Sequence, residues 1–386
     1  MSSGRLAAKK LSPVQWSALT FETVFGMHCF SRLDRCNLTV NCCEVLASAL
    51  SLSSTRLTAL DLSDNNLKDS GVNLLSVGLR SSHCKLRSLS FLFCLYFRLH
   101  KCKLEGGCCE ALAGAVSTEC SCLRNLDLSA NDFHAAGVKA LCVGLCSHHC
   151  KLETLRSDML LAEKNNNTES YCADLSSVLN SESSNLKTLD LSNNSLKDFG
   201  VSVLAVGLRS PHCTLETLSL SHCDLTHKSC DPVGSALSSD SAPLKELDLS
   251  GNNLQGIKPL CSGLRSQHCK LETLSCGVML SPQSVYDFKL CVSPPVLACI
   301  GIKYILTCRL NECNLQECCA DLASVLSSSS SNIKELDLSG NDLQDVEVKQ
   351  LCVGLAKQKT EAAIHQNWTM KDWKNIAWSD DLALTK

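Results

Sequence analysis

The sequence predicts an α/β solenoid, with parallel strands on a concave side and helices on a convex side. The first observation behind this prediction is the phrase LKTLDLSNNSL at Leu186, which returns as LTALDLSDNNL from Leu57 and LKELDLSGNNL from Leu244. The second is the spacing, because copies beginning at Leu186, Leu215 and Leu244 follow one another at steps of 29 residues. A repeat this short indicates units that bury their apolar faces by stacking on one another.

The first half of each unit has the pattern of a short strand. In the copy that begins at Leu57, Leu60 and Leu62 alternate with Asp61 and Ser63. A period of two places the leucines on one face and the polar residues on the other. We therefore expect a parallel sheet with one buried face.

The second half of each unit has helical spacing. Val72, Leu75 and Leu79 are three and four residues apart, which places them on one side of a helix. Glycine also recurs inside these segments, at Gly78, Gly144, Gly207, Gly263 and Gly354. Glycine destabilises a helix by about 1 kcal/mol relative to alanine, so its recurrence indicates close approach of neighbouring helices.

Asparagine or cysteine occupies the position three residues after the last strand leucine. Asparagine stands there at Asn65, Asn131, Asn194, Asn252 and Asn341. Cysteine stands there in the units between, at Cys36, Cys102, Cys223 and Cys313. The chain leaves the sheet at this position, so we expect a buried amide to satisfy backbone groups of neighbouring turns.

The polar strand positions form the candidate binding site, a ladder of carboxylates and hydroxyls on the concave face. Its members are Asp61, Ser63, Asp127, Ser129, Asp190, Ser192, Asp248, Ser250, Asp337 and Ser339. An acidic ladder favours a basic protein partner. The alternative interpretation is a solvated face that only keeps the sheet soluble, because single exposed charges contribute little.

Composition restricts the class of partner and the compartment. The net charge is −3, which gives no general attraction to nucleic acid or to an anionic membrane. The chain has 28 cysteines but no apolar segment typical of a secretory signal follows Lys9 and Lys10. We therefore expect reduced thiols and a cytoplasmic protein.

No motif supports an enzyme or a cofactor site. A phosphate-binding G-x-x-x-x-G-K-[ST] loop, an H-E-x-x-H helix and a G-x-S-x-G turn are all absent from the sequence. Histidine–cysteine pairs recur at His83-Cys84, His149-Cys150, His212-Cys213 and His268-Cys269, and Cys142, Cys146, His149 and Cys150 share helical spacing. The pairs lie in alternate units, beyond the reach of about 2.0–2.3 Å that zinc ligands need, so we expect no metal site. An apolar segment at 290–308 is divided by Pro294, Pro295 and Lys303, and we expect no membrane span.

Several longer phrases resemble one family of repeat proteins. They are KLSPVQWSALTF from Lys10, CCEVLASAL from Cys42, GVxxLxxGLxSxHCKLETL and ECNLQECCADLASVL from Glu312. Together with the alternation of asparagine and cysteine, they resemble ribonuclease-inhibitor-type leucine-rich repeats, and within that class the repeats of fish NLR proteins of the NLRC3 or NLRP type, which carry a NACHT module. The resemblance covers about residues 10–356 and implies a horseshoe fold and a role in innate immunity.

The domain organisation follows from the extent of the repeats. We expect a cap or linker at 1–30, a leucine-rich-repeat domain at 31–356 and a tail without repeats at 357–386. Segments 91–97 and 277–308 interrupt the repeat at one phase, before Arg98 and Arg309. They are either true surface loops or errors of the gene model.

The sequence thus predicts a protein-binding scaffold, in the form of a fragment or isoform of an NLR-type receptor without its nucleotide-binding module. The first alternative is a ribonuclease-inhibitor-like protein that binds a basic partner. The second is a cysteine-rich metal or redox protein. The phrase LDLS does not identify the ligand, since the phrase is nearly identical from unit to unit.

Overall fold

The computed structural model contains two compact units. It describes residues 30–54, 57–86, 97–133, 135–157, 168–254, 258–277, 307–311, 319–327, 335–337 and 350–351. Unit 1 comprises Met1–Ser195 with Val206–Leu215, and unit 2 comprises Leu196–Ala205 with Glu216–Lys386. Most of the predicted cap at 1–30, most of segments 91–97 and 277–308, and the tail at 357–386 lie outside the described residues, whereas Phe30 belongs to the first strand.

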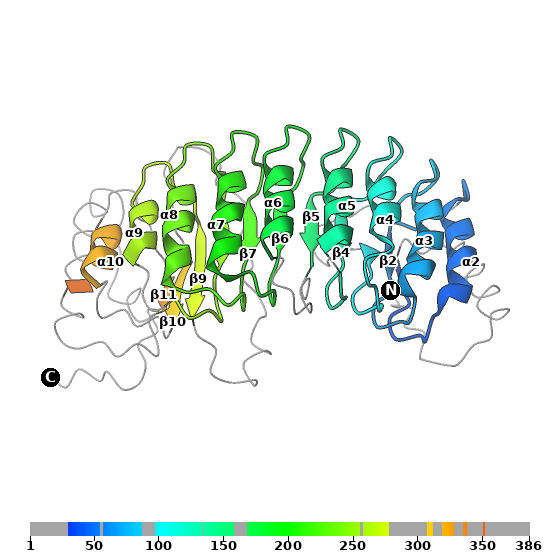
Figure 1. Cartoon of the computed structure of the whole chain (residues 1–386), viewed down its shortest axis with the longest axis horizontal. Helices are drawn as coiled ribbons and strands as arrows, with labels where there is room; N and C mark the ends of the chain where they lie inside the picture. The colour runs from blue at the N-terminus through cyan, green and yellow to red at the C-terminus, as the bar shows by residue number, and fades with distance from the viewer. Residues whose placement is uncertain are drawn as a thin grey trace, which may run out of the picture. The chain divides into compact units, whose positions relative to one another are not determined.

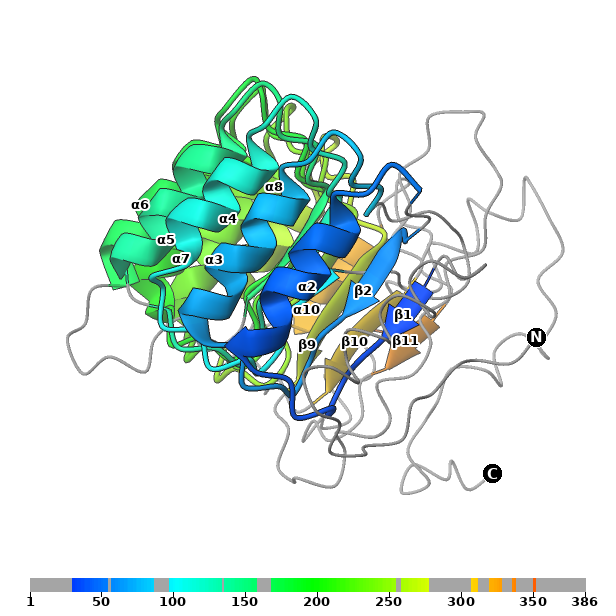
Figure 2. The same ribbon diagram turned by 90° about the vertical axis from the view of Figure 1, so that its right-hand side faces the viewer.

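Strands and helices alternate along unit 1. Its elements are β1 (Phe30–Arg32), α2 (Val40–Leu50), β2 (Ala59–Asp61), α3 (Lys68–Leu79), β3 (Phe97–Arg98), α4 (Cys109–Val116), β4 (Asn125–Asp127), α5 (Ala135–Leu145), β5 (Thr154–Arg156), α6 (Thr168–Leu179) and β6 (Thr188–Asp190). Each strand pairs in parallel with the next strand along the chain. Helices α2 to α6 lie side by side in one layer, and the strands form the other layer (Figures 1 and 2).

Unit 2 repeats this arrangement. Helix α7 (Lys197–Leu208) contributes residues to both units, and unit 2 continues with β7 (Thr217–Ser219), the 3-10 helix η1 (His227–Ser229), α8 (Cys230–Leu237), β8 (Glu246–Asp248), α9 (Lys258–Leu264), β9 (Thr273–Gly277), β10 (Thr307–Asn311), α10 (Cys319–Leu326) and β11 (Glu335–Asp337). Strands β7 to β11 also pair in parallel and in sequence order. The predicted α/β solenoid is therefore confirmed in both units.

The leucines of the repeated phrase form the core. Leu60, Leu126 and Leu189 occupy the middle of β2, β4 and β6, and all three are fully buried. Phe97, the last residue of the predicted insertion at 91–97, begins β3 and is also buried. The register pairs Phe97 with Leu60 and with Leu126, so an aromatic ring continues the row of leucines.

At Asn65, Asn131 and Asn252 the asparagine side chain joins its own turn to the Cys-type turn before it. The Oδ1 atom of Asn131 accepts hydrogen bonds from the backbone amides of Cys102 (2.9 Å) and Leu104 (3.2 Å). Its Nδ2 atom donates to the carbonyl oxygens of Leu99 (2.7 Å) and Leu128 (2.9 Å). Asn65 and Asn252 make the corresponding bonds in their own units. The expected role of the buried amide is thus confirmed at these three positions.

The recurring helix glycines lie where two helix backbones touch. A Cβ atom added at Gly144 of α5 would lie 2.6 Å from Cα of Ala113 in α4, and one added at Gly78 would lie 2.5 Å from the carbonyl oxygen of Ala47. Gly207 and Gly263 are equally crowded. This confirms the predicted close approach of helices at the described positions.

We expect Asn131→Ala to destabilise the chain by about 2–4 kcal/mol, because buried amides and carbonyls of two turns lose their partner and each unsatisfied group costs about 1–3 kcal/mol. The measurement is chemical denaturation with urea. Asn180→Ala is the control, since Asn180 is exposed after α6 and should change the free energy of unfolding by less than about 0.5 kcal/mol. Equal effects of the two variants would contradict the assigned role.

Two glycines on adjacent helices should respond to alanine with opposite signs. Gly144→Ala should destabilise the chain by about 1–3 kcal/mol, because the new methyl group meets the backbone of Ala113. Gly114→Ala should stabilise it by up to about 1 kcal/mol, since the nearest atom is Nη1 of Arg80 at 3.7 Å and alanine favours a helix. Thermal unfolding of both variants checks the prediction, and a loss of stability in Gly114→Ala would show it to be wrong.

Candidate functional site

The predicted aspartate–serine ladder is first of all a structural feature of each turn. The Oδ1 atom of Asp61 accepts from the hydroxyl of Ser63 (2.6 Å) and from its backbone amide (3.1 Å). The same pair of bonds recurs at Asp127 with Ser129, Asp190 with Ser192 and Asp248 with Ser250. Each serine hydroxyl therefore already donates within its own unit.

The ladder is less exposed in unit 1 than the alternation of the sequence predicts. Asp61, Ser63 and Asp127 are buried, with exposed fractions of 5%, 8% and 8%. The prediction that these side chains are exposed on an open face is wrong, and for the two aspartates the reason is the side chain of Arg98. Arg98 of β3 pairs in register with both aspartates and lies across them.

Arginines neutralise the aspartates of unit 1. The Nη1 atom of Arg98 lies 3.5 Å from Oδ2 of Asp61, and its Nε atom lies 3.8 Å from Oδ2 of Asp127. In the same way Nε of Arg156 lies 4.0 Å from Oδ2 of Asp190. The acidic ladder expected from the sequence is therefore an alternating row of carboxylates and guanidinium groups in this unit.

Asp248 of unit 2 has a different environment. The register places Asp248 between Ser219 of β7 and Ser275 of β9, so serines stand where Arg98 and Arg156 stand in unit 1. The hydroxyl of Ser219 lies 3.5 Å from Oδ2 of Asp248. The carboxylate is half-buried and its neighbours in the row carry no charge.

A second row of charges lies directly before the strands, at β4 to β6 in unit 1 and at β7 to β9 in unit 2. In unit 1, Glu153 binds both Arg124 and Lys187, the latter at 3.2 Å. In unit 2, Nζ of Lys245 binds Glu216 at 2.7 Å. This hydrogen bond raises the pKa of Lys245 against the opposing effect of burial, and the nearby charges of Glu272 and Glu246 raise it further.

The second row was not part of the predicted site, although the sequence carries its signal. The phrases LRNLDL, LETLRS, LKTLDL, LETLSL and LKELDL alternate a basic and an acidic residue directly after the first leucine. Parallel pairing brings these residues together. Of the last predicted pair, the structure describes only the backbone of Asp337, in β11, and does not describe Ser339.

The described cysteines are free thiols and form no metal site. All but Cys120, Cys122 and Cys146 are buried. Burial raises the pKa of Cys102 to about 12, although a hydrogen bond with the backbone amide of Asn65 acts in the opposite direction. Burial also raises the pKa of Cys172 to about 12. Within the part of the chain that the structure describes, no group of three histidine, cysteine or acidic residues has the geometry to hold a metal ion.

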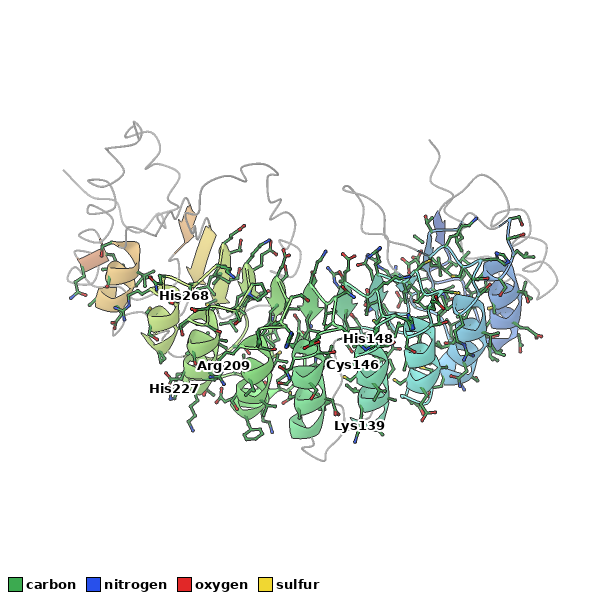
Figure 3. The ribbon with its side chains drawn as sticks, turned by 90° about the horizontal axis from the view of Figure 1, so that it is seen from above. Lys139, Cys146, His148, Arg209, His227 and His268 are labelled. Atoms are coloured by element: carbon green, nitrogen blue, oxygen red, sulfur yellow. The ribbon has the colours of Figure 1, made fainter. Side chains whose placement is uncertain are left out.

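Three of the four histidine–cysteine pairs divide between the core and the solvent, and in the fourth His268 is half-buried beside buried Cys269. Cys84, Cys150 and Cys213 are buried, whereas His83, His149 and His212 are exposed. Figure 3 shows Cys146 and His148 together at the end of α5 and Lys139 on its outer side, away from the strands. The Nδ1 atom of His148 lies 2.6 Å from the hydroxyl of Ser183, so this histidine contacts the neighbouring turn.

Among the helices that the structure describes, none combines the length and the apolar character needed to cross a membrane. The apolar segment at 290–308 lies outside the described residues apart from its last two, which belong to β10.

Comparisons with known proteins agree with the repeated geometry. The leucine-rich-repeat family model matches residues 53–76, 119–142, 182–205, 212–231 and 329–352, and a second leucine-rich-repeat model matches residues 243–264. These matches define the class as leucine-rich-repeat proteins.

Curated relatives give the family. Ribonuclease inhibitor of Mus musculus is 34% identical over 385 residues, an alignment that covers 92% of this chain and 79% of that protein. Ribonuclease inhibitor of Sus scrofa is 32% identical and covers 91% and 78%. NACHT, LRR and PYD domains-containing protein 12 of Homo sapiens is 36% identical over 314 residues, which cover 81% of this chain and 25% of that protein. The chain belongs to the ribonuclease-inhibitor family of leucine-rich-repeat proteins.

Arg98→Met should destabilise the chain by about 1–3 kcal/mol, because two buried carboxylates lose the cation beside them while the apolar stem is kept. Arg35→Met is the matched control. Arg35 binds Asp64 at 3.3 Å, but its side chain is 77% exposed, so the change should stay below about 0.5 kcal/mol. Urea denaturation of both variants measures the difference, and a neutral effect of Arg98→Met would contradict the account of the row.

Proposed function

We propose that this chain binds a protein partner through the outward side of strands β7 to β9 in unit 2, and that the partner presents a basic surface there. The observation that carries the proposal is Asp248, the aspartate of the row whose register neighbours are serines rather than arginines. A lysine or arginine of the partner would supply the cation that Arg98 supplies to Asp61 and Asp127 in unit 1.

The charges around Asp248 support a basic partner. The strand positions of β7, β8 and β9 and the residues preceding them carry Glu216, Glu246, Asp248 and Glu272, against a single Lys245. Glu246 and Glu272 are exposed. Such a surface accelerates association with a cationic protein and excludes anionic ones.

The relatives supply two forms of this function. The name ribonuclease inhibitor, carried by relatives aligned over more than three quarters of their length, favours a basic ribonuclease as the partner class. The 36% identity to the human NACHT, LRR and PYD protein favours an NLR-type innate immune role, in which this chain corresponds to about a quarter of the receptor. In both forms we propose a cytoplasmic scaffold without enzymatic activity or cofactor.

The proposal is tested by titrating the purified chain with a pancreatic-type ribonuclease and measuring binding by calorimetry at about 0.15 M salt. Asp248→Asn should weaken binding about tenfold, which corresponds to about 1.4 kcal/mol, because the amide still accepts from Ser250 but no longer attracts a cation. Higher salt should weaken binding by the unmodified chain as well.

Asp132→Asn is the matched control, since Asp132 is exposed in unit 1 after β4 and lies outside the two rows of charges. It should leave the affinity unchanged. Absence of ribonuclease binding would remove the ribonuclease-inhibitor form of the proposal. A basic partner would be contradicted if Asp248→Asn and Asp132→Asn bound equally well. Transcripts that join this coding sequence to a nucleotide-binding module would favour the NLR form.

A further inference from the structure

One strand of unit 1 lacks the last leucine of the repeated phrase. In the unit of β5 the phrase reads LETLRS, so Leu152 and Leu155 are present but Ser157 stands in the third leucine position. The corresponding residues of the neighbouring strands, Leu128 and Leu191, are buried in the core. The serine is therefore a polar and smaller residue in a core position.

A cavity lies beside this serine. It has a volume of about 20 Å³ and is lined by Leu128, Phe133, Leu141, Leu155, Leu191 and Ser157, among other residues of unit 1. Ser157 is 4% exposed, and its hydroxyl has no hydrogen-bond partner among the described residues. A cavity of this size has room for one water molecule, but a buried water needs two to four polar partners and the lining supplies one hydroxyl. The space is therefore expected to be dry.

The defect extends to the helix that follows β5. On α6, the Oδ2 atom of Asp174 is buried and also has no hydrogen-bond partner among the described residues. Burial of Cys142 on α5, reinforced by the nearby charge of Asp174, raises the pKa of that thiol. Unsatisfied polar atoms and an empty volume both lower the stability of the part of the fold that contains them.

We propose that the repeat of β5 and α6 is a built-in opening joint of unit 1, at which the solenoid separates locally before the repeats around it unfold. The backbone of β5 is paired normally, since its register with β4 and β6 is regular and the amide of Ser157 donates to the carbonyl of Asp190 at 3.0 Å. The weakness lies in the side-chain core behind the strand. In repeat proteins each unit contacts only its neighbours, so one weak unit divides the stack into two blocks that open independently.

The joint also has a consequence for binding surfaces. Local opening would expose Phe133, Leu128 and Leu191, which are buried in the closed state. It would also separate Arg156 from Asp190, and Glu153 from Lys187. In the open state the carboxylate of Asp190 would lose the guanidinium of Arg156, whereas Glu153 would keep Arg124.

Native-state hydrogen exchange followed by mass spectrometry tests this proposal on the full chain. Amides of β5 and α6 should exchange at least tenfold faster than those of β3 and α4. Ser157→Leu, which restores the repeat, should slow exchange in β5 and α6 by at least tenfold and leave β3 and α4 unchanged. Ser157→Val should also slow exchange in β5 and α6. Because valine is smaller than leucine, this variant remains informative if leucine is too large for the cavity.

The reverse substitution, from leucine to serine in another unit, should create a second site of local opening there. Leu99 follows β3 in the position that Ser157 holds after β5, and it is fully buried. Leu99→Ser should accelerate exchange in β3 and α4, and Leu99→Ala should do so less strongly while keeping the fold. The proposal is overturned if β5 and α6 exchange no faster than β3 and α4 in the unmodified chain, or if both Ser157 variants leave their exchange unchanged.

Discussion

In the Asn-type units that the structure describes, the hydrogen bonds of one buried amide are the constraint on which the rest of the structure depends. Asn131 satisfies its own turn and the turn of the preceding unit, through Cys102 and Leu104. Without this amide the chain would leave the sheet with several buried backbone groups unpaired. Because the amide reaches backwards by one unit, the preceding Cys-type turn needs only a small side chain, and buried cysteine serves there.

This frame fixes the positions of the outward side chains and therefore the distribution of charge. Parallel pairing in register places Arg98 between Asp61 and Asp127, but Asp248 between Ser219 and Ser275. Two units with nearly the same repeated phrase thus present different electrostatic surfaces. The difference at Asp248 comes from Ser219 of β7 and Ser275 of β9, which stand where Arg98 and Arg156 stand in unit 1.

Much of the fold could be predicted from the sequence, because the leucine spacing, the asparagine position and the glycine position each report a local requirement. The exposure of Asp61 could not, since it depends on Arg98, whose strand begins at Phe97, the last residue of a segment that interrupts the repeat. The pairs of Glu153 and Lys245 with their neighbours were readable in the alternating charges but appear only when the strands are placed in register. The cavity at Ser157 required the packed core, although its cause is a single departure from the phrase.

The central claim is that the asparagine amides, rather than the strands alone, hold the turns in place. The most direct measurement is residue-resolved amide hydrogen exchange by NMR at Cys102, Leu104, Cys223 and Leu225, whose amides donate to Asn131 and Asn252. The account predicts that these turn amides are protected as strongly as the amides of the adjacent strands. Exchange at the rate of exposed loop amides would contradict it.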